Sequence, residues 1–133
     1  MKVLKKGTLT IDYFIDDNFL LVKRVDTENK DNEYYKEQIL EWKSIIEKFK
    51  PERQLIDYTD YTFPITPELQ KFTNENLLED SYKIGLKKVA FLISHNLFVQ
   101  MSIEKIMDKD AGKMFDIKYF DNFKKAKDWI LKK

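Results

Sequence analysis

The sequence contains no cysteine and a single histidine, His95. Without cysteine the chain has no disulfide, no thiol nucleophile and no cysteine-ligated zinc or iron–sulfur site, and one imidazole cannot build a multi-histidine metal centre. Asp57 and Asp60, with Asp16 and Asp17, supply carboxylates, but an oxygen-ligand site needs about six or more donors and their spacing matches no known loop. We therefore expect neither a metal nor another cofactor.

The sequence also lacks an excess of one charge and a long hydrophobic run. Its 24 basic and 23 acidic side chains nearly cancel, so no long-range field favours nucleic acid or an anionic membrane. No segment approaches the roughly 20 apolar residues of a membrane helix, and the first residues, MKVLKKGTLTIDYF, lack the apolar run of a signal peptide. We expect a cytoplasmic protein with no nucleic-acid partner and no integral membrane segment.

The chain does contain enough apolar and aromatic side chains for one core. Hydrophobic residues make up 43% of the sequence and aromatic residues 14%, which is too apolar for a disordered chain. A length of 133 residues is common for one domain and allows about two thirds of the unfolded surface to be buried. We expect residues 1–133 to form a single domain.

The first half of the chain is predicted to form a hairpin and a helix. The β-rich runs Thr8–Ile15 and Asn18–Val25 surround residues that tolerate tight turns, Asp16-Asp17-Asn18. A polar linker, Asp26 to Asn32, leads to the segment EYYKEQILEWKSIIEKFK, and Pro51 ends the helix predicted there. The apolar residues that recur on one face of this helix are Tyr35, Ile39, Trp42, Ile46 and Phe49.

The middle of the chain adds a strand and a second helix. Leu55-Ile56 followed by Asp57-Tyr58 indicates a short buried strand. Thr66 is a good N-cap, and Pro67 fits the first helical position, where its missing N–H is harmless. The helix TPELQKFTNENLLEDSYK then ends at Gly85, although its apolar positions are less regular than those of the first helix.

The last third contains two more strand–helix units. Lys87–Ile93 is nearly continuously apolar, which is typical of a central parallel strand covered on both faces. A helix follows in NLFVQMSIEKIMDKD, then a strand in KMFDIKYF, to whose buried side Met114 is expected to contribute. Asp121 is predicted to cap a final helix with the apolar face Phe123, Ala126, Trp129 and Ile130.

The predicted order ββαβαβαβα indicates an α/β fold with a mixed sheet. An N-terminal β-hairpin followed by strand–helix units implies right-handed crossovers, an antiparallel edge and parallel later strands. Ligands of such sheets bind beyond the carboxyl ends of the strands. Those ends carry Asp57-Tyr58-Thr59, Ser94-His95-Asn96 and Phe120-Asp121.

The strand RQLIDYT, the block KKVAFLISHNLFVQMSIEKI and the ending FDIKYFDNFKKAKDWIL resemble the SpoIIAA-like branch of the STAS-like proteins, the sulfate transporter and anti-sigma antagonist family. In that branch a strand of type KVAxV precedes a helix bearing a phenylalanine, and a late aromatic strand precedes a helix ending of the type Ala-x-x-Trp-Leu. The resemblance spans most of the chain. Its motifs concern packing, so the resemblance implies the fold rather than an activity.

The resemblance also implies a place for regulatory phosphorylation. Anti-sigma antagonists of this fold carry a phosphorylatable serine in an Asp-Ser-Ser-Gly-like sequence after the strand that corresponds to QLIDYT. Here Asp57 is followed by Tyr58, Thr59 and Asp60, without serine or glycine. The hydroxyl candidates are Thr59, Thr62 and Thr66, and a phosphate near Thr66 would lie favourably at a helix N-terminus.

The helix after Ile93 has two apolar faces. Val99, Ile103 and Ile106 share one face, whereas Leu97 and Met101, flanked by Phe98, lie nearly opposite. In one interpretation the loop from Asp60 to Ile65 folds over the second face. In the other, that face is exposed and pairs with a second copy or a partner, or lines a site for an apolar ligand.

Three functions follow from these patterns. The favoured one is a non-enzymatic interaction or regulatory module that binds a protein partner or a second copy of itself. The alternative is a carrier or sensor of a lipid or other apolar small molecule, because the SpoIIAA-like branch is similar in fold to CRAL-TRIO domains. An enzyme with His95 as general base, poised by Asp57 or Asp121, has the least support, since no second catalytic group completes the set. The predicted binding surface consists of Tyr58, Thr59, Tyr61, Phe63, His95, Leu97, Phe98 and Met101.

Overall fold

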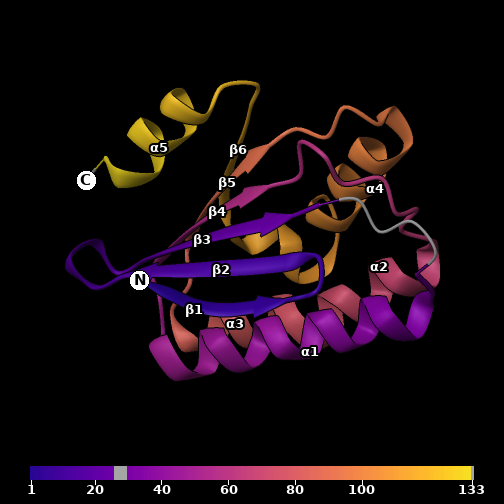
Figure 1. Ribbon diagram of the computed structural model, residues 1–133, viewed down its shortest axis with the longest axis horizontal. Coiled ribbons are helices and arrows are strands. Elements are labelled where there is room, and N and C mark those ends of the chain that lie inside the picture. The colour runs from indigo at the N-terminus through magenta and orange to yellow at the C-terminus, as the bar shows by residue number, and fades with distance from the viewer. Residues whose placement is uncertain (26–29, 133) are drawn as a thin grey trace.

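The computed structural model describes residues 1–25 and 30–132 and contains a six-stranded mixed sheet (Figure 1). The strands lie side by side in chain order; the first two pairs are antiparallel and the other three parallel. They are β1 (Lys2–Lys6), β2 (Leu9–Phe14), β3 (Phe19–Arg24), β4 (Arg53–Asp57), β5 (Lys88–Leu92) and β6 (Asp116–Phe120). The predicted α/β class and mixed sheet are confirmed.

Strand β1 is the main addition to the predicted order, which becomes βββαβαβαβα. It pairs antiparallel with β2, and the register shifts between Lys2 and Leu4. Its sequence, KVLKK, places its two apolar residues side by side instead of alternating, so the period-two signal of a strand is absent. Lysines on an edge strand discourage pairing with other chains, which explains why a strand can have this composition.

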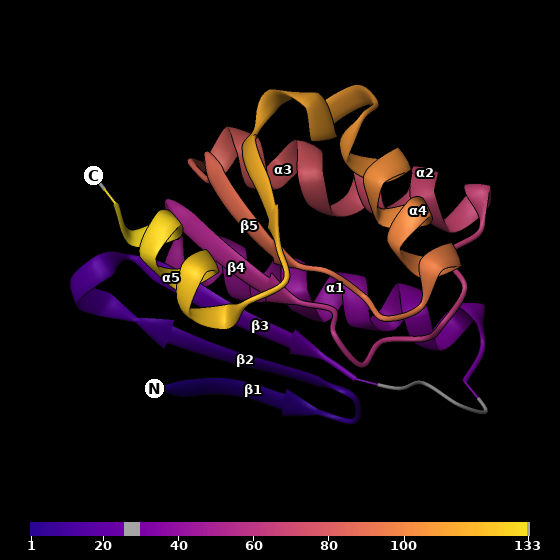
Figure 2. The same ribbon diagram turned by 90° about the horizontal axis from the view of Figure 1, so that it is seen from above.

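The helices are distributed unequally over the two faces of the sheet (Figure 2). They are α1 (Asn32–Phe49), α2 (Pro67–Thr73), α3 (Glu79–Ile84), α4 (Leu97–Met107) and α5 (Phe123–Leu131). The first four helices pack on one face of the sheet and enclose the larger core. Helix α5 alone packs on the other face of the sheet. Lys87–Ile93 was predicted to be covered on both faces, and this is confirmed: β5 places Val89 and Phe91 in the larger core and Ala90 and Leu92 against α5.

Helices α2 and α3 are joined by a π-helical turn, Asn74–Leu78. A π turn adds about one residue per turn and so rotates the following residues about the helix axis. The inward positions therefore change from Leu69 and Thr73 to Leu77, Leu78 and Ser81. This change of phase accounts for the irregular apolar spacing of the segment. The predicted N-cap is confirmed, because the Thr66 hydroxyl accepts from the Leu69 N–H at 3.5 Å.

Four expectations at the ends of elements were wrong. Asn122 caps α5 in place of Asp121, its side-chain oxygen accepting from the Lys125 N–H at 3.0 Å. Met114 is exposed because residues 110–114 form a 3-10 turn and the strand begins only at Asp116. Phe123 is also exposed, and only Ala126 and Ile130 are fully buried on α5. Of the predicted linker Asp26 to Asn32, residues 26–29 lie outside the described residues, and Asn32 already belongs to α1.

Candidate functional site

The carboxyl ends of β3, β4, β5 and β6 meet at one edge of the sheet, where an α/β fold binds its ligands. The loop between β4 and α2 crosses this edge. Its hydrogen bonds include one within the loop, from the Tyr61 N–H to the Tyr58 carbonyl (3.0 Å). The Ser94 hydroxyl donates to the Tyr61 carbonyl (2.9 Å) and the His95 N–H to the Thr59 carbonyl (3.2 Å), and these two bonds hold the loop against the segment that leads into α4.

The aromatic side chains of this loop point into the protein. Tyr58, Tyr61 and Phe63 are all buried, with Tyr61 only 1% exposed. The prediction that these three residues belong to an exposed binding surface was therefore wrong. The physical reason is that Tyr61 and Phe63 alternate with exposed residues and fill the space between α1 and the sheet, where Phe63 stacks on Tyr35 with ring centroids 5.9 Å apart.

The buried loop surrounds a charged residue, Arg24, the last residue of β3. Its side chain is fully enclosed, with 1% of its surface exposed. The guanidinium lies 4.4 Å from the ring centroid of Tyr61, 5.0 Å from Tyr35, 5.6 Å from Trp42 and 5.7 Å from Tyr58. We call these four rings the Arg24 cage. Two come from α1 and two from the loop, so the cage forms only when the loop is folded inward.

The polar contacts of Arg24 are incomplete. One terminal nitrogen donates to the Gln38 side-chain oxygen at 3.1 Å, and the other donates to the Tyr58 hydroxyl at a long 3.4 Å. Nε has no hydrogen-bond partner in the part of the chain that the structure describes. Among residues 1–25 and 30–132, no carboxylate forms an ion pair with Arg24. The rings thus face a buried cation without a described counter-charge.

The groups around Arg24 have shifted pKa values. Burial raises the pKa of the Tyr61 hydroxyl far above its ordinary value, and the nearby guanidinium offsets this only in part. Burial likewise raises the pKa of the Tyr35 hydroxyl, which shares a hydrogen bond of 2.7 Å with the Thr73 hydroxyl. Both tyrosines are therefore neutral at physiological pH and do not balance the charge of Arg24.

Sequence reasoning missed Arg24, although one signal pointed to it. In the run FLLVKR, Leu20 and Val22 face the larger core, and Arg24 continues the same alternation. A charged residue at an inward position and at the carboxyl end of a strand was the available signal. The four rings could not have been assigned to it, because they come from segments distant in sequence.

The start of α4 is fixed by a polar network. The Ser94 N–H donates to the Gln100 side-chain oxygen at 2.9 Å, and the Asn96 N–H donates to the Ser94 hydroxyl at 3.0 Å. Asn96 caps the helix, since its side-chain oxygen accepts from the Val99 N–H at 3.1 Å. The first turn of α4 is consequently held in one orientation relative to β5.

The two apolar faces predicted for α4 are both present, and they have opposite environments. Val99, Ile103 and Ile106 are buried in the larger core. Leu97, Phe98 and Met101 are 68%, 79% and 47% exposed, and we call them the α4 patch. The interpretation in which the loop from Asp60 to Ile65 covers this face was wrong, because Tyr61 is buried beside Arg24 and Phe63 is buried against Tyr35.

The remaining candidates show no catalytic arrangement. His95 is exposed, and within the described ranges no ion pair joins its ring to a carboxylate. The Asp57 carboxylate accepts from the Thr59 N–H at 2.9 Å, an ordinary turn contact. Thr59 is half-buried and Thr62 and Thr66 are exposed, and their phosphorylation stays a prediction.

Within residues 1–25 and 30–132, no group of three or more His, Asp or Glu side chains is arranged to hold a metal ion. Nor does that part of the chain contain a helix with the length and apolar character needed to cross a bilayer.

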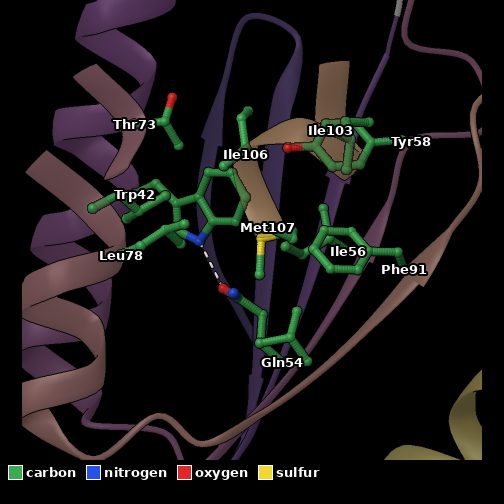
Figure 3. Close-up of a pocket in the computed structure, with 12 residues that line it drawn as sticks. Trp42, Gln54, Ile56, Tyr58, Thr73, Leu78, Phe91, Ile103, Ile106 and Met107 are labelled. Carbon is green, nitrogen blue, oxygen red and sulfur yellow. Dashed lines mark hydrogen bonds between the residues drawn. The ribbon is translucent and has the colours of Figure 1, made fainter. Parts of the chain in front are cut away.

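A small apolar hollow lies between the sheet and the helices of the larger core (Figure 3). Its volume is about 20 Å³, room for roughly one water molecule. Trp42 closes one side and donates its ring N–H to the Gln54 oxygen at 2.7 Å, and Leu77 and Leu78 of the π turn form another wall. Trp42 and Tyr58 line the hollow and also belong to the Arg24 cage, so the hollow and the cage are adjacent.

Comparison with solved structures identifies a protein of similar fold. No protein-family model and no curated protein matches the sequence. Among solved structures, the chain is similar to an uncharacterized protein from Shewanella loihica PV-4, a DUF3478-family member with a SpoIIAA-like fold. The TM-score is 0.60 at 18% sequence identity, and the match covers 96% of this chain and 99% of that chain. The predicted SpoIIAA-like fold is confirmed, and identity this low shows the fold alone.

Proposed function

We propose that this SpoIIAA-like chain is a non-enzymatic interaction module that associates with a second copy of itself through the α4 patch. The observation that carries the proposal is the exposure of Leu97, Phe98 and Met101 on one rigidly capped helix. Large apolar side chains gathered on a surface are typical of binding sites, and aromatic residues and methionine are enriched in interface cores.

The charges beside the patch favour a second copy as the partner. In a two-fold symmetric dimer the same surface contacts itself, so it must be complementary to itself in charge. Helix α4 places Glu104 beside Lys105, and Asp108 beside Lys109 follows it. The surface next to the patch thus carries charges of both signs, so it does not repel a second copy as a surface of one sign would. Three side chains cannot supply the roughly 800 Å² that each partner of a stable complex buries, so they serve as the centre of a wider contact.

Sedimentation equilibrium of wild type and Phe98→Ser tests the proposal. We expect wild type to form concentration-dependent dimers and Phe98→Ser to lower the association constant at least tenfold, as truncation of a central interface residue does. The matched control is Ile15→Ser, because Ile15 is equally exposed, at 77%, but lies at the amino end of β3, at the opposite edge of the sheet. Wild type that stays monomeric up to its solubility limit, or equal weakening by both substitutions, would contradict the proposal.

The hollow beside Trp42 supports a second function, carriage or sensing of an apolar small molecule. Its walls are almost entirely apolar, and one of them is a π turn, a feature often found at functional sites. A ligand would have to enlarge it, because small-molecule sites generally enclose about 300 Å³ or more. Native mass spectrometry of protein purified from its own host distinguishes the two functions: a stoichiometric small-molecule adduct would favour the carrier, and a dimer without an adduct would favour self-association.

A further inference from the structure

The environment of Arg24 differs from that of an ordinary structural arginine. Removing a guanidinium from water is strongly unfavourable unless an opposite charge and hydrogen bonds replace the lost solvent. The Arg24 cage supplies cation–π attraction, and Gln38 supplies one good hydrogen bond. Among the described residues Nε has no partner and no carboxylate balances the charge, and the bond to Tyr58 is long. The site therefore has unused capacity for an anion.

The position and cover of Arg24 agree with a ligand site. Arg24 ends a parallel strand at the edge where α/β sheets bind ligands. On one side it is covered by the long helix α1, and on the other by the loop from Tyr58 to Ile65, which contains no helix or strand. Displacement of the loop would remove Tyr61, the ring closest to the guanidinium, and would exchange the loop's bonds to Leu92, Ser94 and His95 for bonds to water.

We infer that Arg24 is the receptor for a small carboxylate or phosphate-type anion, which binds when the loop Tyr58–Ile65 moves away from the sheet edge. The planar guanidinium presents donors in the geometry that matches two oxygens of such an anion. Binding exchanges the ring of Tyr61 for an anion, which supplies a counter-charge and a partner for Nε that the described residues do not. This site is separate from the α4 patch and does not depend on self-association.

Nuclear magnetic resonance of the arginine side chains tests the inference on the intact wild-type chain. The sequence has two arginines, Arg24 and Arg53, so the Nε–H region of a ¹⁵N spectrum should hold two signals. Arg53 is only half-buried and donates to the Asp17 carbonyl at 2.8 Å, which makes it an internal reference for general salt effects. We expect the Arg24 signal to shift saturably on titration with sodium phosphate or sodium acetate, beyond its response to sodium chloride of equal ionic strength.

Two variants connect the response to its proposed cause. Tyr61→Leu removes the ring that competes with the anion and is expected to tighten binding about fivefold to tenfold. Arg24→Met should abolish the anion-dependent rise in melting temperature, while retaining the general stabilisation by phosphate that follows from its exclusion from protein surfaces. If either variant fails to fold, the titration of wild type still decides.

Three results would overturn the inference. The first is an Arg24 signal that responds to neither phosphate nor acetate beyond chloride. The second is an equal, unsaturable shift of the Arg24 and Arg53 signals. The third is an anion response that appears only in Asp26→Asn/Glu28→Gln, since the chain's own carboxylates would then be the counter-charge of Arg24.

Discussion

At the scale of single residues, the pair Trp42 and Gln54 joins α1 to the sheet. Both side chains are buried, and the indole N–H donates to the Gln54 oxygen at 2.7 Å. A buried donor that loses its partner keeps the full penalty of leaving water. We predict that Gln54→Leu lowers the free energy of unfolding by about 1–3 kcal/mol, measured by urea denaturation.

A double-mutant cycle isolates this hydrogen bond from side-chain packing. Trp42→Phe removes the donor, and the double variant removes both polar partners, so their effects should be less than additive by about 1 kcal/mol. Strictly additive effects would show that the bond contributes nothing beyond the packing of the two side chains.

Position 112 has no room for a side chain, because the backbone of another segment lies close to Gly112. A Cβ at this position would lie 2.6 Å from the Met107 Cα and would overlap the Ile106 carbonyl oxygen, both of them backbone atoms that cannot turn aside. Gly112→Ala is therefore predicted to destabilise the protein by about 1–3 kcal/mol through strain. Lys113→Ala, next in the chain and exposed, is the control and should change the unfolding free energy by less than about 0.5 kcal/mol.

At the scale of elements, the π turn is tied to α4 and its following turn by one side chain. The Asn74 amide donates to the Ile106 carbonyl and accepts from the Gly112 N–H, both at 3.1 Å and both buried. The widened turn places Asn74 between α2 and the end of α4 while Leu77 and Leu78 stay in the core. One residue thus connects the irregular turn to the wall of the hollow.

Replacement of Asn74 should consequently be more harmful than replacement of its neighbour. We predict that Asn74→Ala lowers the unfolding free energy by about 1–3 kcal/mol, because it removes the side-chain donor to the buried Ile106 carbonyl and one of the two acceptors of the Gly112 N–H, which keeps the Lys109 carbonyl at 3.0 Å. Asn76→Ala removes only a partly buried bond to the Phe72 carbonyl, and about 1 kcal/mol or less is expected. Equal losses in chemical denaturation would mean that the bonds of Asn74 are replaced by water.

At the scale of the whole molecule, the two faces of the sheet differ in the amount of buried packing between the sheet and its helices. The larger core draws on α1, the composite helix from α2 to α3 and α4, whereas α5 buries only Ala126 and Ile130 fully. Lys88 adds bonds to the carbonyls of Trp129 at 2.7 Å and Lys132 at 3.1 Å, near the C-terminal end of α5. Elements with few buried contacts open locally before the whole protein unfolds.

Hydrogen exchange should therefore show a lower opening free energy for α5 than for the larger core. Amides of α5 are predicted to exchange through local opening, at a lower free energy than those of β3, β4 and α1. Lys88→Met should accelerate exchange in α5 with little change in α1, since it removes the two bonds at the helix end. Identical exchange free energies for α5 and β4 would show that the second face unfolds only together with the core.

The order of strands and helices was largely readable from local pattern, and its errors have local causes. Lys87–Ile93 was recognisable because a strand covered on both faces has little room for polar residues. Strand β1 was missed because an edge strand needs no apolar alternation. The α4 patch was predicted as one of two possibilities, since periodicity shows that a helix has two apolar faces but not which of them is covered.

The fold class, the cap at Thr66 and the two-faced character of α4 follow from local sequence pattern, because each depends on residues close together in the chain. Which aromatic residues are buried, which face of α4 stays exposed and what surrounds Arg24 follow only from the folded structure. These features depend on contacts between β3, α1 and the loop after β4. These segments are separated in the sequence, and the sequence pattern does not indicate that they lie close together in the fold. The inward turn of Tyr58, Tyr61 and Phe63 follows from the space between α1 and the sheet, and that space exists only once the chain has folded.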